Sequence, residues 1–436
     1  MSERLLFAGA RVIDPVSGLD DVRDVLIEGG RIAGLGDLSG DDAQSDTEVI
    51  GCDGLILAPG FVDMHTHLRE PGFEHKETIE SGTRSAAVGG YTAVAPMANT
   101  EPVADHAGVV HEVRDLAAAA GLCDVFPVGA ITKGLDGESL AEIGEMVEAG
   151  VRMFSDDGRC VPTARLLRNA LVYAKAFDDV IIAEHCEDAS LGENGQMHEG
   201  FHSYSLGLRG QPAEAEEVIV ARDLAIARMT GTRLHICHLS SARSVELVRR
   251  AKVEGIRVTA EVTPHHLVFT DDDLVTYDTN LKVNPPLRSQ EDRDALRAGV
   301  ADGTIDAIAT DHAPHAVEEK EAEFDQSPPG TIGLETALAS VLTELVEPGI
   351  LTVARALEAM STAPARILGA SEHGGPIQPG RPANLVVFDP GAEWVVQSPF
   401  ASKSRNSAFL GRTMHGKVVH TALRGELTVT NGKATR

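Results

Sequence analysis

Two histidines one residue apart follow an apolar run in the stretch PGFVDMHTHLREPG. Residues i and i+2 of a β-strand point to the same face of a sheet, so the imidazoles of His65 and His67 can reach one metal ion. Arg69 follows two residues later, and its planar guanidinium suits a bidentate contact with a carboxylate. The stretch predicts a metal site beside an anion-binding group, or else only a strand end with polar residues.

Further imidazoles and carboxylates close other apolar runs, in the stretches FSDDG, IIAEHC, LHICHLS and DAIATDHAPH. These residues are Asp156, Asp157, His185, His238 and Asp311. Imidazole and carboxylate are the donors preferred by zinc and its neighbours among the transition metals. Four histidines, Asp311 and one aspartate of FSDDG exceed the needs of one ion, whereas two ions sharing a bridging carboxylate would use them all. Each motif alone is more often a turn or a packed strand end than a metal ligand, so the prediction depends on their joint occurrence.

Three more polar residues follow the same kind of run: Asn99, Asn284 and His315. Each alone is most simply a surface or turn residue, but together with Arg69 they would supply donors suited to an anion. The stretch HAVEEKEAEFDQSPPG begins at His315 and has little apolar content. It predicts a mobile loop, either a lid over the site or plain surface.

The middle of the chain alternates apolar, strand-like runs with helix-like segments. The eight runs are Phe61–His67, Tyr91–Met97, Asp124–Ile131, Val151–Ser155, Val180–His185, Arg233–Leu239, Arg257–Thr263 and Ile305–Thr310. Expected helices include Glu77–Val88, Ser139–Ala149, Ala213–Met229 and Ala242–Glu254. Eight such units predict an α/β fold of the (β/α)8 TIM-like barrel type, in which the polar residues at the strand ends converge on one mouth. A doubly wound open sheet is the alternative, although no GxGxxG-like turn opens any of the helices.

The two ends of the chain differ from its middle. Residues 1–58 and 366–436 read as short alternating strands with glycine-rich turns, and we expect them to pair in one small composite β-sandwich domain. The barrel would then occupy residues 59–365.

Composition excludes several classes of protein. The formal net charge of −28 disfavours binding to nucleic acid or anionic membranes, and no apolar run is long enough to span a bilayer. The five cysteines form no CxxC pair, which argues against a disulfide framework or a zinc knuckle. The N-terminal residues lack a signal-peptide pattern, so a cytoplasmic location is the default expectation.

Nine stretches together resemble the bacterial type I dihydroorotases of the amidohydrolase superfamily. They are PGFVDMHTHLREPG, PMANTEP, FSDDG, AEHCED, CHLSS, EVTPHHL, NPPLR, ATDHAPH and GLET. The resemblance covers nearly the whole chain, because GPIQPGRPANLVVFDP is similar to the composite β-sandwich of that superfamily.

The resemblance implies two zinc ions per subunit, bridged by Asp157 and a hydroxide. The implied ligands are His65, His67 and Asp311 for the first ion, and His185 and His238 for the second. Many relatives use a carboxylated lysine as the bridge, where this chain has Ser155. Asp156 stays open as an alternative to Asp157.

The resemblance also implies the reversible conversion of N-carbamoyl-L-aspartate to L-dihydroorotate, the third step of pyrimidine synthesis. In hydrolysis the hydroxide attacks the ring amide, and Asp311 acts first as general base and then as general acid. The implied substrate-binding residues are His67, Arg69, Asn99, Asn284, His315, Pro329 and Gly330. Related sequences often have Phe-Gly at the last two positions.

Two other functions stay open. An allantoinase or dihydropyrimidinase would share the barrel and metals, but Arg69 and the absent bridging lysine argue against a neutral ring as substrate. A non-catalytic scaffold for aspartate carbamoyltransferase is disfavoured because every expected ligand is present. We expect a homodimer, and association of an active enzyme with that carbamoyltransferase is left open.

Overall fold

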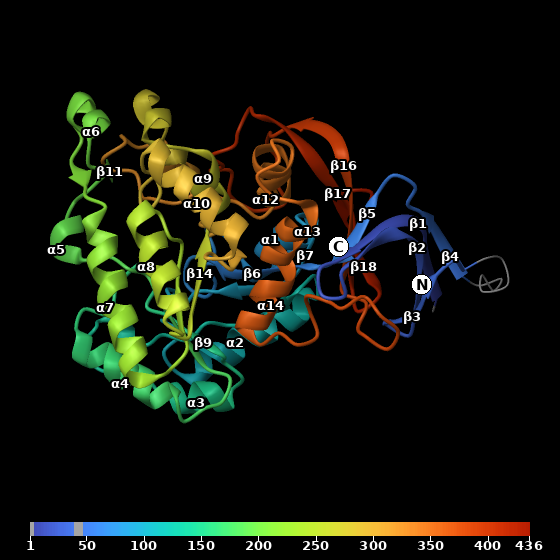
Figure 1. Cartoon of the computed structure of the whole chain (residues 1–436), viewed down its shortest axis with the longest axis horizontal. Coiled ribbons are helices and arrows are strands. Elements are labelled where there is room, and N and C mark those ends of the chain that lie inside the picture. Colours follow the sequence, from blue (N-terminus) through green and yellow to red (C-terminus); the bar gives the residue numbers. More distant parts are fainter. Residues whose placement is uncertain (1–3, 39–46) are drawn as a thin grey trace.

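The computed structural model describes residues 4–38 and 47–436. Residues 1–3 and 39–46 of the predicted N-terminal unit lie outside the described residues. Figure 1 shows helices packed around short strands in one part and a long twisted sheet in the other, with the C-terminus at that sheet. No helix in the described ranges is long and apolar enough to cross a membrane.

The strands of the middle part are short and parallel. They form sheets in the orders β6-β7-β8 and β15-β14-β13-β10-β9. Their bounds are β6 (Phe61–Thr66), β7 (Tyr91–Pro96), β8 (Asp124–Val125), β9 (Met153–Phe154), β10 (Ile181–Glu184), β13 (Leu234–Ile236), β14 (Val258–Val262) and β15 (Ala307–Ile308). Isolated parallel bridges join the two sheets at both edges, Gly129 with Phe154 and Thr66 with His312. The backbone pairing therefore runs in a closed circuit, and the predicted mixed α/β architecture with parallel strands is confirmed.

The third run is the least regular of the eight. We predicted a strand over 124–131, but regular pairing covers only Asp124–Val125. Pro127 has no N–H to donate and interrupts the ladder there. Its neighbours still pair, because Phe126 donates to the Val94 carbonyl at 2.9 Å and Val128 to that of Pro96 at 3.0 Å.

Helices cover the outside of this circuit (Figure 1). Their bounds are α1 (Ile79–Val88), α2 (Ala107–Ala120), α3 (Ile143–Glu148), α4 (Ala164–Ala174), α5 (Ala189–Gly192), α6 (Phe201–Leu206), α7 (Glu214–Thr230), α8 (Ala242–Val253), α9 (Pro264–Val268), α10 (Gln290–Asp302), α11 (Val317–Lys320), α12 (Ala337–Val341), α13 (Val353–Leu357) and α14 (Ala363–Leu368). Side chains that cap the first turn fix several starts: Thr78 accepts from the Ser81 N–H, and Ser241 from the Ser244 N–H. The four helices predicted by range all form; α3 covers only six residues of the predicted 139–149, and the other three differ by one or two residues at an end.

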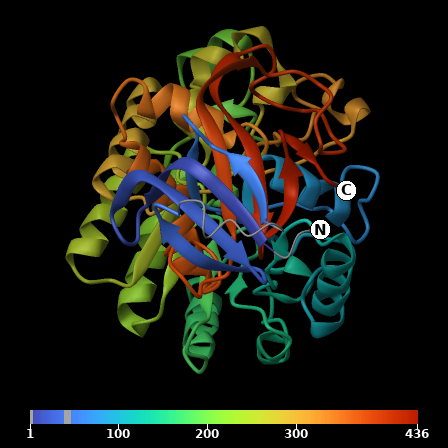
Figure 2. The same ribbon diagram turned by 90° about the vertical axis from the view of Figure 1, so that its right-hand side faces the viewer.

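Strands from both ends of the chain share one sheet, seen face-on in Figure 2. Its order is β19-β18-β17-β16-β5-β1-β2-β3, with β4 paired to β1. The bounds are β1 (Arg4–Asp14), β2 (Leu19–Glu28), β3 (Arg31–Gly36), β4 (Thr47–Gly51), β5 (Ile56–Pro59), β16 (Leu385–Val395), β17 (Thr413–Leu423), β18 (Glu426–Thr430) and β19 (Lys433–Ala434). A separate pair, β11 (Met197–His198) and β12 (Gly210–Gln211), is not part of the three sheets above.

Strand β5 connects the terminal sheet to the parallel strands. It pairs antiparallel with β16 and runs through Gly60 directly into β6. A Cβ on Gly60 would lie 2.3 Å from the Thr92 Cγ2, so only glycine allows the two segments to approach this closely. Phe61 packs beyond this junction against Tyr91 and Phe388, with ring centroids 5.6 and 6.4 Å apart. The first histidine motif is thus held by a rigid, buried junction.

Candidate active site

The six side chains predicted to bind metal lie together at the carboxyl ends of five parallel strands. His65 is the second-last residue of β6, and the others follow β6, β9, β10, β13 and β15 within a few residues. Each of the six is at most 8% exposed: His65, His67, Asp157, His185, His238 and Asp311. The structure therefore brings together donors that are up to 246 positions apart in the chain (65 to 311).

Asp157 lies at the centre of this cluster. Its Oδ1 is 3.3 Å from the Nε2 atoms of His65 and His238 and 3.5 Å from the Nδ1 of His185. Its Oδ2 is 3.4 Å from the Nε2 of His67. Burial opposes ionisation, but the surrounding histidines, His65 foremost, hold the pKa of the Asp157 carboxyl well below its usual range. One ionised carboxylate thus faces His65 and His67, the predicted ligands of the first ion, and also His185 and His238, those of the second. This is the geometry that a bridging ligand needs.

The neighbouring carboxylate points elsewhere. Asp156 accepts hydrogen bonds from the Ile131 N–H at 2.8 Å, from the Thr132 N–H at 3.0 Å and from the Thr132 hydroxyl. Burial raises its pKa in spite of these donors. Asp156 thereby fixes the loop after β8, and the geometry favours Asp157 as the residue that serves the cluster.

A second layer of acceptors orients the imidazole rings. The Nδ1 of His65 donates to Glu261 at 2.6 Å, and the Nδ1 of His67 donates to the Asn99 amide oxygen at 2.9 Å. Because the outer nitrogen of each ring is occupied in this way, the inner Nε2 would offer its lone pair to a metal ion bound in the cluster. Sequence reasoning missed Glu261, although its place at the end of a buried strand in EVTPHHL was a usable signal.

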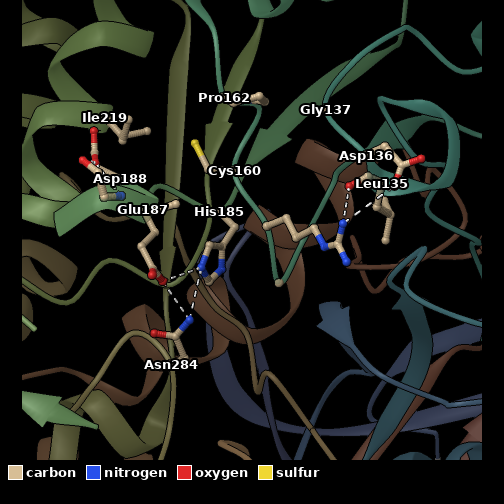
Figure 3. A pocket seen from close by; sticks show the side chains of 14 residues that line it. Leu135, Asp136, Gly137, Cys160, Pro162, His185, Glu187, Asp188, Ile219 and Asn284 are labelled. Atoms are coloured by element: carbon tan, nitrogen blue, oxygen red, sulfur yellow. Dashed lines mark hydrogen bonds and ion pairs between the residues drawn. The ribbon is translucent and has the colours of Figure 1, made fainter. Parts of the chain in front are cut away.

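His185 is held by a carboxylate that the sequence analysis also missed. Its Nε2 lies 3.3 Å from Glu187, and Asn284 donates its amide hydrogen to the same Glu187 oxygen at 2.9 Å (Figure 3). Burial opposes the effect, but hydrogen bonding to His185 lowers the pKa of Glu187 to about 2. These three residues line one wall of a cavity of about 520 Å³ beside the cluster. Asn284, predicted to bind substrate, is therefore tied to a predicted metal ligand.

The cluster fits a metal centre by its donors and by an unpaired atom. The Nε2 of His65 is buried without a hydrogen-bond partner among the described residues. Two groups of donors lie within 4.8 Å of one another, His65 with Asp157 and His238, and His65 with His67 and Asp311. The backbone of His238 and Asp311 has φ of 28° and 46°, values that non-glycine residues rarely adopt. Strained backbone and unsatisfied nitrogen are typical of a site organised for a ligand.

The predicted anion-binding residues form a group of their own. Arg69 donates from Nε to the Pro314 carbonyl at 3.1 Å, and its Nη2 is 3.5 Å from the Nε2 of His315. That nitrogen also donates to the Pro329 carbonyl at 2.9 Å. No carboxylate of the described residues lies within 4.0 Å of the half-buried guanidinium. The Gly330 backbone also lies close to the His315 ring, since a Cβ on Gly330 would be 2.9 Å from the His315 Nε2. An arginine without an anionic partner beside a metal-type cluster is suited to a substrate carboxylate.

Comparisons with known proteins identify relatives of this chain. A family model described as "Dihydro-orotase-like" matches residues 54–244. A dihydroorotase of Pelotomaculum thermopropionicum is 50% identical over 98% of this chain and 98% of its own. A dihydroorotase of Streptomyces coelicolor is 50% identical over 99% of this chain and 100% of its own.

Solved structures of cyclic-amide hydrolases share the fold. The L-hydantoinase (dihydropyrimidinase) from Arthrobacter aurescens superposes with a TM-score of 0.88 at 26% identity, covering 99% of this chain and 97% of its own. The dihydropyrimidinase from Brevibacillus agri gives 0.85 at 23% identity, over 99% of this chain and 96% of its own. The fold is shared widely, whereas the high identity over the full length is to dihydroorotases. The chain belongs to the dihydroorotase family.

Proposed function

We propose that this protein is a dihydroorotase that interconverts L-dihydroorotate and N-carbamoyl-L-aspartate. The observation that carries the proposal is the half-buried Arg69, which lies beside the histidine–aspartate cluster and pairs with no carboxylate of the described residues. A cyclic amide that also bears a carboxylate would engage both groups at once. The identity of about 50% to proteins named dihydroorotase supports the same substrate.

The hydrolytic step follows from the positions of the residues. Two zinc ions held by this cluster would supply Lewis acidity and a water that ionises near neutral pH. In hydrolysis, a water oxygen bonds to the ring carbonyl carbon, the amide C–N bond breaks, and that carbon becomes the carbon of a new carboxylate. Asp311, whose Oδ1 is 3.0 Å from the His67 Nε2, takes the proton of the attacking water and returns it to the leaving nitrogen.

The predicted anion-binding residues around Arg69 would position the substrate. Arg69 and His315 would hold the ring carboxylate, with Asn99, Asn284 and the Pro329–Gly330 backbone around it. Such positioning contributes several kcal/mol to lowering a barrier, because the reacting atoms need not find one another.

The proposal includes the finer architecture expected from the sequence. The closed pairing circuit supports a (β/α)8 barrel over residues 59–365, and the shared terminal sheet supports a β-sandwich built from both ends of the chain. Two zinc ions per subunit, a homodimer, a cytoplasmic location and association with aspartate carbamoyltransferase stay predictions from the resemblance.

A substrate panel tests the function. We expect the zinc-loaded protein to hydrolyse L-dihydroorotate with a kcat/KM about 10³-fold or more above that for dihydrouracil or allantoin, because those rings leave Arg69 unpaired. Initial rates by ultraviolet absorbance would measure all three, and N-carbamoyl-L-aspartate would be tested in the reverse direction. Preference for a neutral ring would indicate a dihydropyrimidinase or allantoinase, and no turnover of any ring would favour the scaffold.

Replacing Arg69 by alanine is expected to raise KM for dihydroorotate strongly while kcat changes less. Truncating one partner of a desolvated charge pair costs roughly 2–5 kcal/mol, which is about 30-fold or more in affinity. Steady-state kinetics would check this, with Arg84→Ala as the control, since Arg84 pairs with Glu80 on the surface of α1. An unchanged KM in Arg69→Ala would place the carboxylate clamp elsewhere.

A further inference from the structure

Two buried lysines without carboxylate partners hold the segment that follows His315. Lys282 is 6% exposed and Lys320 is 7% exposed. Within residues 4–38 and 47–436, no Asp or Glu oxygen forms an ion pair with either ammonium group. Lysine is almost never buried unless it is paired, because removing its charge from water is costly. The two side chains therefore need an explanation beyond surface charge.

Both ammonium groups donate to main-chain carbonyls of the same segment. Lys320 contacts the carbonyl oxygens of Pro328 at 2.9 Å and Gly330 at 3.0 Å. Lys282 contacts the Phe324 carbonyl at 2.7 Å and lies over the Phe324 ring, 5.3 Å from its centroid. The main chain of Lys282 also accepts from the Gly330 N–H at 2.8 Å. The segment is thus fastened at both its middle and its end.

The carbonyl between the two that bind Lys320 points to the site. The Pro329 oxygen accepts from the His315 Nε2 at 2.9 Å, while the oxygens before and after it are held by Lys320. Lys320 therefore holds the first and third of three successive carbonyls and His315 holds the second, while the Asn406 amide also donates to the Gly330 carbonyl at 3.1 Å. Holding the outer two fixes the direction of the middle one, and with it the orientation of the His315 ring.

Burial of the Lys320 ammonium group is electrostatically unfavourable, yet the side chain is buried in this fold. Burial and the nearby charge of Lys282 lower the pKa of Lys320 to about 7, while Asp278 and Glu319 act in the opposite direction. A methionine of similar length would avoid that cost but could donate no hydrogen bond. This cost is explained if the hydrogen bonds that Lys320 donates are needed to hold one particular segment, which is the turn at Pro328–Gly330.

The close approach of this turn is itself tightly specified. Gly330 has φ of 138°, and a Cβ there would lie 2.9 Å from both the His315 Nε2 and the Ala313 Cβ. Only glycine brings the backbone this near to the imidazole without a clash. The turn is therefore packed against His315 from one side and anchored by Lys320 from the other.

We propose that Lys320 is a positioning residue for substrate binding, which anchors the Pro328–Gly330 turn so that His315 faces the carboxylate of the substrate. The proposal rests on the dihydroorotase function proposed above. It assigns Lys320 a role in affinity for the carboxylated ring and none in the proton transfer made by Asp311.

Replacing Lys320 by methionine separates this role from simple stabilisation. We expect KM for dihydroorotate to rise about 10-fold, because hydrogen bonds from a charged donor are lost, while kcat stays within about threefold. The control is Lys252→Met, which removes an ammonium that donates to the Gly303 carbonyl and Asp306, far from the site. Both variants should melt at a lower temperature than the parent, but only Lys320→Met should change KM.

Three further measurements keep the result interpretable. Metal content of each variant should equal that of the parent protein, and turnover by the parent and Lys252→Met establishes the function independently. If Lys320→Met does not fold, Lys320→Gln retains an N–H donor and should give a smaller rise in KM. An unchanged KM in a folded, metal-loaded Lys320 variant would overturn the proposal, as would an equal rise in Lys252→Met.

Discussion

Replacing Asp311 by asparagine is expected to lower kcat for dihydroorotate by about 10³-fold, the usual contribution of a positioned general acid–base. Asp311 follows β15, and its Oδ1 lies 3.0 Å from the His67 Nε2 and 3.6 Å from the His65 Nε2. A carboxylate held there can take a proton from an attacking water and return it to the leaving nitrogen. An amide of the same size keeps the shape and loses the proton acceptor. Stopped assays with high enzyme concentration would quantify the residual rate.

The same strand offers a matched control. Asp306 lies just before β15, at its opposite end, where it accepts from the Ala260 N–H and pairs with Lys252. Asp306→Asn should lower the melting temperature while leaving kcat close to that of the parent. A normal kcat in a folded, metal-loaded Asp311→Asn variant would assign the proton transfer to another group.

Removing metal is expected to abolish turnover, and zinc or cobalt should restore it. Chelation leaves the buried histidines and Asp157 without a shared cation, so the apo protein should also melt at a lower temperature. Activity, melting temperature and metal content by atomic emission would be followed through removal and reloading. Full activity in a preparation shown to be free of metal would refute the metal centre.

The two neighbouring aspartates allow a paired test of the bridge. Asp157→Asn should reduce metal content well below that of the parent, because Asp157 faces His65, His67, His185 and His238. Asp156→Asn should retain the metal, since Asp156 is occupied by the backbone of Ile131 and Thr132. Equal loss in both variants would mean that the effect comes from the loop rather than from ligation.

Patterns within short stretches of sequence predicted the features that depend on neighbouring residues, such as the strands and the direction of their side chains. The apolar runs gave the order and approximate limits of the parallel strands, because a buried parallel strand is apolar on both faces. The spacing of His65 and His67 indicated that both side chains point to the same face of the sheet. The polar residues at the strand ends indicated where the site lies. Pro127 is equally plain in the sequence, and its missing N–H accounts for the shortened third strand.

Features that depend on distant partners could not be read in the same way. Asp156 and Asp157 are identical in type and adjacent, and only the folded loops show which one the histidines surround. Glu261 orients His65 across 196 positions of sequence. Lys320 lies in the run EEKEAE and looks like a solvated charge, yet it is buried together with Phe324 and Ser327. Of the two alternatives for this segment, a lid or plain surface, plain surface is wrong for these residues, because the carbonyls that bind Lys320 lie on a turn that no local pattern reveals.

The pairing of β5 with β16 has a consequence for the order of folding during synthesis. Leu57 and Val387 are partners in that pairing although 330 positions separate them (387 − 57). The ribosome therefore releases the whole region of parallel strands before the partner of β5 exists. Until the final segment emerges, one edge of β5 is open to competing strands of other chains. Loss of the last fifty residues is accordingly expected to leave a chain that aggregates through the open edge of β5.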